Sequence, residues 1–513
     1  MIQPTILQNL YTFGSLRNTA EGVAISLKNR VTDIVLNQFV KVQIGPMELG
    51  AKDLELELGD GQWRRAPEVT LDRPEPFHLK QVANLRAPGR RIEDGRHVIR
   101  IVVEIQGLGG ISFQVEDQTA EAAPGTGHVP CAKDDNYAPA IIGARQSYVE
   151  AYADVKLRHV SQYSFDPKVT QGNIENFTGV AQVPLGFAGP LHIKGEHAQG
   201  EFLIPLATTE GTLVASYNRG MKLLNLSGGV TCTVQGDHMQ RAPVFIFESA
   251  REALAFRNWV EQHLEDLRRE AQATTASGRL TFVDTYLASK FAYLRFNFTT
   301  GDAAGQNMVG RATFAACCWI LEQCPIPITR FFLESNLAGD KKASQMHLLH
   351  TRGKRVTAEC VIKREVLLEV LHVEPESLAC HWGVATVGSA FSGAINNGAH
   401  SANAIAAMFI ATGQDVANLA EGSAGILYVE LTPERDLYAS MTLPSLIVAT
   451  HGGGTGLPTQ QECLRVLGCL GAGKVCKFAE IIAGVVLAGE LSLGAAISSM
   501  EWVSSHEKFG RNR

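Results

Sequence analysis

Alternating apolar and polar residues predict β-strands in the first part of the chain. In HVIRIVVEIQG the apolar residues from Ile99 to Ile105 alternate with mostly polar neighbours, and the alternation resumes after LGG. Because successive side chains of a strand point to opposite faces, this pattern predicts a hairpin. DLELELGDGQW shows the same alternation before an Asp60-Gly61 turn. We therefore predict an all-β sandwich over residues 1–118.

The pattern changes after this segment. The small residues, Pro and Gly of TAEAAPGTGHVP predict a linker at 119–130. Residues 243–333 then show the order strand, helix, strand, strand, helix, strand, which is that of a ferredoxin-like unit. This inserted unit divides a larger α/β domain into 131–242 and 334–500, and a polar tail follows at 501–513. The predicted fold class is therefore a multidomain α+β protein.

Composition excludes several classes of protein. The chain has 513 residues, of which 45% are hydrophobic and 19% are charged. These values are typical of a globular protein, and the length predicts about two to four domains. The net charge of −6 lacks the basic excess that nucleic acids and anionic membranes attract. We therefore expect neither as a partner.

Targeting and cysteine patterns indicate a cytoplasmic protein. The first residues show no basic segment followed by a long apolar run, which argues against a secretory signal. FAEIIAGVVLAGELSLGAAI is interrupted by Glu480 and Glu490, so it predicts a buried helix and not a membrane span. The ten cysteines lack the spacing of a zinc site or a disulfide framework, so we expect reduced thiols and no metal.

One carboxylate stands in an apolar stretch. In IPLATTEGTLVAS, Glu210 is the only acid between Glu201 and Asp237. A carboxylate on apolar walls is costly unless it is paired, hydrogen-bonded or protonated. One interpretation is that Thr208 or Thr209 starts a helix and Glu210 lies in its first turn, where the helix dipole favours negative charge. The other is a functional acid, and this stretch alone leaves both open.

Five further stretches differ from ordinary scaffold. AGDKKAS places charged residues after a predicted strand, as a solvated turn or as a site, and ATGQDVAN places Asp415 on an apolar helix, where an acid needs a partner. HGGGTGLP is either a tight turn or a loop whose N–H groups face a phosphate or carbonyl oxygen. GDAAGQNMVG lacks the fingerprint of a Rossmann domain. SSHEKFGRNR leaves His506 on a polar tail.

Together these stretches resemble one family. ENFTGVAQVPLGFAGPL, ATTEGTLVASYNRG, GDKK, NAIAAMFIATGQD, HGGGTGLPTQQ and SSH occur in the order found in 3-hydroxy-3-methylglutaryl-coenzyme A (HMG-CoA) reductases. The amino-acid sequences of these motifs are similar to those of the eukaryotic and archaeal class of the family. The resemblance implies a reductase that makes mevalonate and coenzyme A with two equivalents of NADPH, or of NADH. It does not cover the first 118 residues.

The resemblance also implies roles for individual residues. Lys341 would stabilise the alkoxide formed by hydride transfer, and Glu210 would protonate it. Asp415 would orient Lys341 and keep Glu210 protonated. His506 would protonate the coenzyme A thiolate. The resemblance further implies substrate contacts from Arg241, Ser335, Asp340, Lys342 and Asn403; coenzyme A contacts from Ser216, Asn218, Arg219 and Lys222; and cofactor contacts from Asp302, Gly305, Asn307, Gly452, Gly453 and Gly454.

The family builds its site between two subunits, so at least a homodimer is implied. Three positions depart from the family pattern: Val384 replaces a lysine that binds the substrate carboxylate, His451 replaces an apolar residue, and the contact to the cofactor 2′-phosphate has no clean counterpart, although Arg279 lies nearby in sequence. A reductase of another acyl thioester is therefore an alternative. A catalytically retired scaffold is a weaker one, because retirement normally erodes a catalytic side chain and all four are present.

Overall fold

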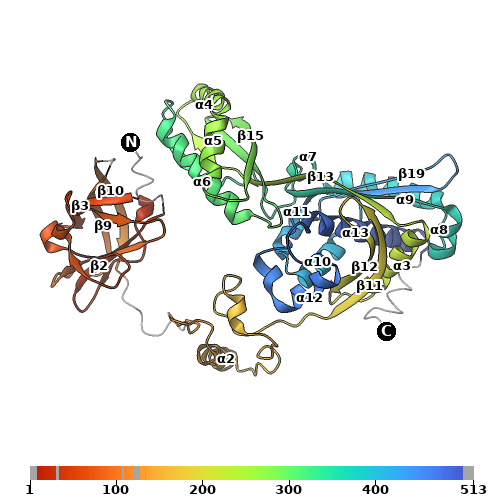
Figure 1. Ribbon diagram of the computed structural model, residues 1–513, viewed down its shortest axis with the longest axis horizontal. Coiled ribbons are helices and arrows are strands. Elements are labelled where there is room, and N and C mark those ends of the chain that lie inside the picture. The colour runs from red at the N-terminus through yellow and green to blue at the C-terminus, as the bar shows by residue number, and fades with distance from the viewer. Residues whose placement is uncertain (1–7, 31–33, 107–108, 120–127, 133, 501–513) are drawn as a thin grey trace. The chain divides into compact units, whose positions relative to one another are not determined.

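The computed structural model describes residues 8–30, 34–106, 109–119, 128–132 and 134–500, and His506 with its tail lies outside this part of the chain. The chain forms two compact units (Figure 1). One comprises residues 1–128, and the other comprises nearly all of the chain from Val129 onward.

The first unit contains two sheets around one apolar core. The predicted hairpin is confirmed, because Ile111 pairs with Val103 and Val115 with Ile99. Inward residues such as Leu56, Leu85 and Ile101 are fully buried. The strands of one sheet lie in the order β1 (Arg17–Asn18), β2 (Gly22–Lys28), β8 (Val82–Pro88), β5 (Glu55–Glu57), β6 (Arg64–Arg65). The strands of the other lie in the order β10 (Gly109–Gln118), β9 (Arg96–Ile105), β3 (Ile34–Ile44), β4 (Met47–Gly50), and β7 (Glu75–Phe77) also pairs with β3. Three short 3-10 helices, η1 (Gln8–Leu10), η2 (Ala51–Asp53) and η3 (Ala66–Glu68), complete it.

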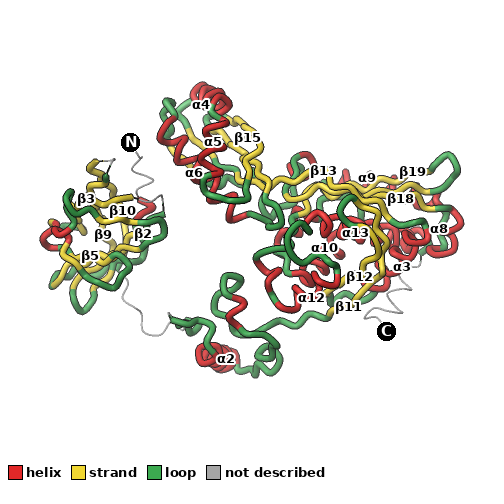
Figure 2. The backbone as a smooth tube through the Cα atoms, in the orientation of Figure 1, coloured by secondary structure: helices red, strands yellow, loops and turns green. Residues whose placement is uncertain are grey.

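The second unit is organised by a ten-stranded sheet. Its larger part has the order β12 (Gln199–Ala207), β11 (Leu185–Gly195), β13 (Val230–Arg241), β18 (Gly353–Ile362), β20 (Leu437–Leu446), β19 (Ile426–Leu431). Figure 2 shows these strands curving around helices α10 (Ser401–Thr412) and α13 (Val475–Ser498). The other elements of this part are α2 (Pro139–Ala153), η4 (Pro167–Thr170), α3 (Leu213–Leu226), α7 (Met346–Leu349), α8 (Arg364–Leu371), α9 (Pro375–Ser392), η5 (Val416–Asn418), α11 (Leu419–Gly422), η6 (Gly453–Gly456) and α12 (Pro458–Val466).

The inserted unit has the predicted βαββαβ order. Its strands lie in the antiparallel order β17 (Arg330–Phe332), β14 (Val244–Ile246), β16 (Phe291–Thr299), β15 (Arg279–Ala288), which is the ferredoxin-like order. Figure 1 shows α4 (Ala250–Gln262), α5 (Leu264–Gln272) and α6 (Gln306–Gln323) together beside these strands. The first helix of the predicted order is formed by two helices, α4 and α5, which meet at His263. Because β13 also pairs with β16, the insert continues the large sheet.

Helix α13 is the central helix of the second unit. It is long and apolar enough to cross a membrane, but 78% of its most apolar window is buried inside the fold. The prediction of a buried helix is confirmed. Its two acids are also buried and hydrogen-bonded: Glu480 accepts from the backbone of the β11–β12 turn, and Glu490 accepts from the N–H groups of Ala399 and His400, just before α10. Interior carboxylates of this kind are stable because donors surround them.

Candidate active site

The Lys341 ammonium and the Asp415 carboxylate form an ion pair. Nζ and Oδ2 are 3.0 Å apart, and each side chain is 45% exposed. Asp415 does not lie on the expected helix, because α10 ends at Thr412 and Gly413 turns the chain in the left-handed region. Asp415 instead caps η5 by accepting from the Ala417 N–H. The structure therefore joins two predicted catalytic residues from separate loops.

Residues that flank Lys341 are also engaged. The Arg352 guanidinium donates to Asp340 Oδ1 over 2.6 Å, and Lys342 Nζ donates to the Asp340 carbonyl. Arg241 lies 3.7 Å from the Asp340 carboxylate. Ser335 Oγ donates to the carbonyl that follows Arg241 in the chain. Four of the five predicted substrate contacts thus gather around one loop, and this loop is not a plain solvated turn.

Glu210 is neither buried nor in the first turn of a helix. It is exposed in the chain and not buried, because the inward residues of β12 end at Ala207 and the following turn emerges from the core. It does not cap a helix, because α3 begins at Leu213 and has no acid in its first turn. Its Oε2 accepts from Asn403 Nδ2 over 2.6 Å. Asn403, the fifth predicted substrate contact, therefore lies with Glu210.

In the single chain, the predicted catalytic residues Glu210 and Asp415 line different cavities. Glu210 and Asn403 line one of about 440 Å³. Asp415 lines another of about 700 Å³, together with five predicted cofactor residues: Gly305, Asn307, Gly452, Gly453 and Gly454. The two cavities have no lining residue in common.

The glycine-lined cavity can accept a ligand close to the backbone. A Cβ at Gly452 or Gly453 would meet no atom within 4 Å, and both residues have positive φ. Backbone N–H groups without side chains can approach a phosphate closely. Pro458 opens α12 at the end of this loop. His451 also lines the cavity and is its one basic side chain among the described lining residues.

Asp302 is the exception among the predicted cofactor residues. Its carboxylate accepts from the N–H groups of Gly473, Lys474 and Val475 over 2.7, 3.0 and 3.2 Å, at the start of α13. Burial raises the pKa of this carboxyl, but these hydrogen bonds outweigh burial and hold the pKa below its ordinary value. The residue is not part of the cavity lining. Its observed contacts are those of a helix cap.

The predicted coenzyme A contacts lie along α3. Arg219 donates to Ser492 on α13 through Nε and Nη2, and Ser216 shares a hydrogen bond with the same Ser492 hydroxyl. The Asn218 side-chain oxygen accepts from the Gly189 N–H. Lys222 is exposed. Of the four, Lys222 presents the most accessible charge to an anion.

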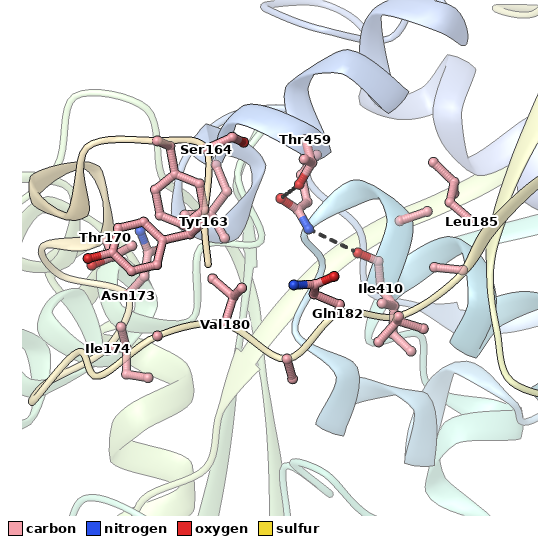
Figure 3. A pocket seen from close by; sticks show the side chains of 18 of the residues that line it. Tyr163, Ser164, Thr170, Asn173, Ile174, Val180, Gln182, Leu185, Ile410 and Thr459 are labelled. Atoms are coloured by element: carbon pink, nitrogen blue, oxygen red, sulfur yellow. Dashed lines mark hydrogen bonds between the residues drawn. The ribbon is translucent and has the colours of Figure 1, made fainter. Parts of the chain in front are cut away.

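A third cavity, of about 780 Å³, connects the other two. It shares Val183, Ala207 and Ile410 with the Glu210 cavity, and Asn173 and Leu457 with the glycine-lined cavity. Figure 3 shows Tyr163 and Asn173 on one side and Ile410 and Thr459 on the other. The third cavity therefore lies between the other two.

One cluster has the composition of a metal site. Glu196, His197 and Glu480 lie together, but the Glu480 oxygens already accept from the N–H groups of Glu196, His197 and Ala198. The cluster is therefore accounted for by the β11–β12 turn.

Two residues near Lys341 were not predicted from the sequence. Arg352 and Glu421 are fully buried and lie beneath the Lys341 loop. TRGKR and ANLAEGS have the composition of polar surface segments, so no pattern in either stretch indicates a buried charge.

A glycine-lined cavity next to a lysine–aspartate pair is the arrangement of an enzyme that brings a large polar ligand to a charged reacting centre. A family model described as hydroxymethylglutaryl-coenzyme A reductase matches residues 141–511. The chain therefore belongs to that family.

A model described as the hydroxymethylglutaryl-CoA reductase N-terminal domain matches residues 6–120. The expectation that the family resemblance excludes the first 118 residues is therefore wrong.

Individual relatives agree with this assignment. The 3-hydroxy-3-methylglutaryl-coenzyme A reductase of Methanothermobacter thermautotrophicus is 44% identical over 370 residues, which are 72% of this chain and 92% of that protein. The enzyme of Pyrococcus abyssi is 45% identical over 375 residues, with the same coverage. A class II enzyme of Streptococcus pneumoniae, solved bound to NADPH, is 21% identical and has a TM-score of 0.53 over 68% of this chain and 92% of that one. This last likeness supports the fold.

Proposed function

We propose that the chain reduces 3-hydroxy-3-methylglutaryl-CoA to mevalonate and coenzyme A, with Lys341, Asp415, Glu210 and His506 as its catalytic residues. The observation that carries this proposal is the Lys341–Asp415 ion pair at the edge of a glycine-lined cavity, in a chain that belongs to this family. The nicotinamide supplies hydride in each of the two reductions.

Lys341 stabilises the oxygen that becomes negative when the thioester carbonyl is reduced. A fixed cation at this position acts most strongly where water is excluded. Asp415 holds the ammonium in place through the 3.0 Å contact. Glu210 donates the proton that the oxygen takes up, and Asn403 orients its carboxyl group. His506 protonates the departing thiolate.

The assay that tests this function measures nicotinamide oxidation with a panel of coenzyme A thioesters. We expect turnover with HMG-CoA and mevalonate as the product. Val384 favours one alternative, a reductase of an acyl thioester without a terminal carboxylate, because valine cannot pair with that carboxylate. Faster turnover of such a thioester than of HMG-CoA would support the alternative, and no turnover of any thioester would contradict both.

NADPH is the proposed cofactor, and the glycine-lined cavity fits its phosphates. Arg279, at the start of β15, is a candidate partner for the 2′-phosphate. The neighbouring Gly278 lies next to Met308, which lines the cavity, since a Cβ at Gly278 would be 3.0 Å from Met308 Cε. Arg279→Ala should raise KM for NADPH and leave KM for NADH unchanged. Arg269→Ala, an exposed arginine of the same unit, is the control, and equal changes for both cofactors would exclude Arg279 from this role.

A homodimer with shared sites is supported by two observations. Glu210 and Asp415 line different cavities of one chain. Helix α9 also leaves apolar side chains exposed at Val384, Val387 and Phe391. A second copy would cover such a surface and bring Glu210 of one chain to Lys341 of the other. Exposed apolar patches of this kind mark interaction sites.

Complementation between two inactive variants tests the shared site. Glu210→Gln and Lys341→Ala are each expected to be inactive, and a mixed dimer would contain one site with both residues intact. Activity should therefore appear when the two variants are mixed and allowed to exchange subunits. Absence of activity in a mixture shown to contain mixed dimers would place both residues in the same chain's site.

The proposed domain division is 1–118, a linker at 119–130, the catalytic domain at 131–242 and 334–500 with the insert 243–333, and the tail 501–513. The protein is proposed to be cytoplasmic, in keeping with its ten free cysteines. A truncated protein beginning near Cys131 should keep its turnover, because every proposed catalytic residue lies after the linker. A folded but inactive truncated protein would show that the first domain is required for the chemistry.

A further inference from the structure

The backbone of Lys341 has an unusual conformation for a residue with a side chain. Its φ of 55° lies in the left-handed region, which non-glycine residues rarely adopt. Gly339, two residues earlier, also has positive φ and packs so closely on His347 that a Cβ would lie 2.5 Å from Nε2. Such a conformation persists only where surrounding contacts determine it.

Glu421 supplies one of these contacts from the interior. This carboxylate on α11 is 0% exposed. Its Oε1 accepts from the Lys341 backbone N–H over 3.1 Å and from Arg352 Nε over 3.2 Å. The acid therefore binds the main chain of the residue whose side chain is the proposed catalytic cation.

Arg352 links the residue before Lys341 to the large sheet. It is also 0% exposed, and its Nη2 donates to Asp340 Oδ1 over 2.6 Å. Nη1 donates to the Gln240 carbonyl over 3.1 Å, on β13. The planar guanidinium thus joins Asp340, Glu421 and the large sheet through separate donors, which a lysine could not do with the same geometry.

We propose that Glu421 and Arg352 are positioning residues for the reduction: they fix the main chain at Lys341 so that its ammonium meets both Asp415 and the reacting carbonyl oxygen. Neither residue touches the substrate. The inference rests on the proposed role of Lys341. Burying an ion pair is weak evidence for stability, because apolar residues often serve as well. The pair's contacts with the Lys341 N–H and with the Asp340 side chain favour the positioning role.

A double-mutant cycle separates positioning from general stability. Glu421→Gln keeps the side-chain shape and an oxygen that can accept from both Lys341 N–H and Arg352 Nε, but it removes the negative charge that pairs with Arg352. We expect kcat to fall at least about tenfold, with KM for the nicotinamide cofactor unchanged, because small displacements of a catalytic group have large effects on rate. Glu421→Gln combined with Lys341→Ala should be no slower than Lys341→Ala alone, since Glu421 acts through the lysine.

Glu480→Gln is the matched control. Glu480 is equally buried and also accepts backbone N–H groups, but its donors lie in the β11–β12 turn and not in the Lys341 loop. It should keep its kcat per folded molecule. Arg352→Lys keeps the positive charge but not the planar guanidinium, and it should also lower kcat. It is the second test of the inference in case Glu421→Gln fails to fold.

The outcomes are distinct. Losses that multiply in the double variant, or equal losses of kcat in Glu421→Gln and Glu480→Gln, would show that Glu421 acts only on stability. Normal kcat in both Glu421→Gln and Arg352→Lys would also overturn the inference, and the proposed function would stand. Normal kcat in Lys341→Ala would overturn the proposed role of Lys341 and the inference with it.

Discussion

Lys341 Nζ lies 3.0 Å from Asp415 Oδ2, and this contact joins the loop after β17 to the turn after α10. Both side chains are partly exposed, so the pair contributes little to stability. Its value is positional, because the ammonium is held at the edge of the cavity that Asp415 and the glycine loop line.

Lys341→Ala should therefore remove catalysis and leave the fold intact. Loss of a group that stabilises a developing oxyanion typically lowers kcat by about a hundredfold to a thousandfold. Steady-state kinetics and a thermal unfolding curve of the same preparation measure the two effects. Lys41→Ala is the control, since Lys41 forms a similarly exposed pair with Glu48 in the first unit. A folded Lys341→Ala protein with near-normal turnover would remove Lys341 from the mechanism.

Close packing between α3 and α13 predicts a sharp difference between two glycines. A Cβ at Gly220 would lie 1.9 Å from the Ala488 carbonyl oxygen, whereas a Cβ at Gly143 would meet nothing within 4 Å. Gly220→Ala should destabilise the second unit by about 1 to 3 kcal/mol through overpacking. Gly143→Ala should stabilise its helix by roughly 0.5 to 1 kcal/mol. Urea unfolding of both variants measures the two changes in the free energy of unfolding.

Gly220→Ala should also raise KM for the acyl-CoA substrate, because Ser216 and Arg219 lie on the displaced helix. Equal stability of the two variants would mean that α3 and α13 can separate without cost.

Buried His347 predicts a dependence of stability on pH. Burial, with the charges of Arg352 and Arg295, lowers the pKa of His347 to about 4. Because the unfolded chain binds the proton more readily, the contribution of this group is complete above about pH 6.5 and is lost as pH falls toward about 4. The loss amounts to at most about 3 kcal/mol, at 1.36 kcal/mol for each pKa unit.

His347→Gln should remove this part of the pH dependence. The measurement is urea unfolding of both proteins at several values between pH 7.5 and pH 4, and the quantity compared is the difference between their free energies of unfolding. Other titrating groups are common to both proteins and cancel to first order. A difference that stays constant with pH would show that His347 is protonated equally in the folded and unfolded chains.

The sequence predicted those features that depend on local periodicity. The β9–β10 hairpin and the βαββαβ insert follow from patterns of apolar residues, and the structure contains both. The exposure of Glu210 was not predictable in this way. Its apolar neighbours belong to the end of β12 and face the core, whereas Glu210 lies in the turn that leaves it.

Long-range contacts account for the other differences. Asp302 lies in a motif that resembles a cofactor site, but its carboxylate caps a helix that begins 173 positions later in the chain. Arg352 and Glu421 lie in polar stretches and become buried only when α11 packs beneath the Lys341 loop. Burial of such groups depends on tertiary contacts, and the local pattern of apolar and polar residues does not reveal those contacts.

Val384 gives the most specific prediction about the substrate. A lysine at this position in the family would pair with the terminal carboxylate of the acyl group, and valine offers only an apolar contact. The Val384 side chain is 66% exposed on α9, so Val384→Lys should fold normally because no charge becomes buried in the chain. KM for HMG-CoA should then fall by the equivalent of one charge-assisted hydrogen bond, about 1.5 to 3 kcal/mol. KM for an analogue without the terminal carboxylate should change little. Leu368→Lys, at a 41% exposed position on α8 outside this apolar surface, is the control for added charge. Equal changes for both thioesters in Val384→Lys would mean that this position does not face the substrate carboxylate, and Arg241 and Lys342 would then be the remaining candidates to bind it.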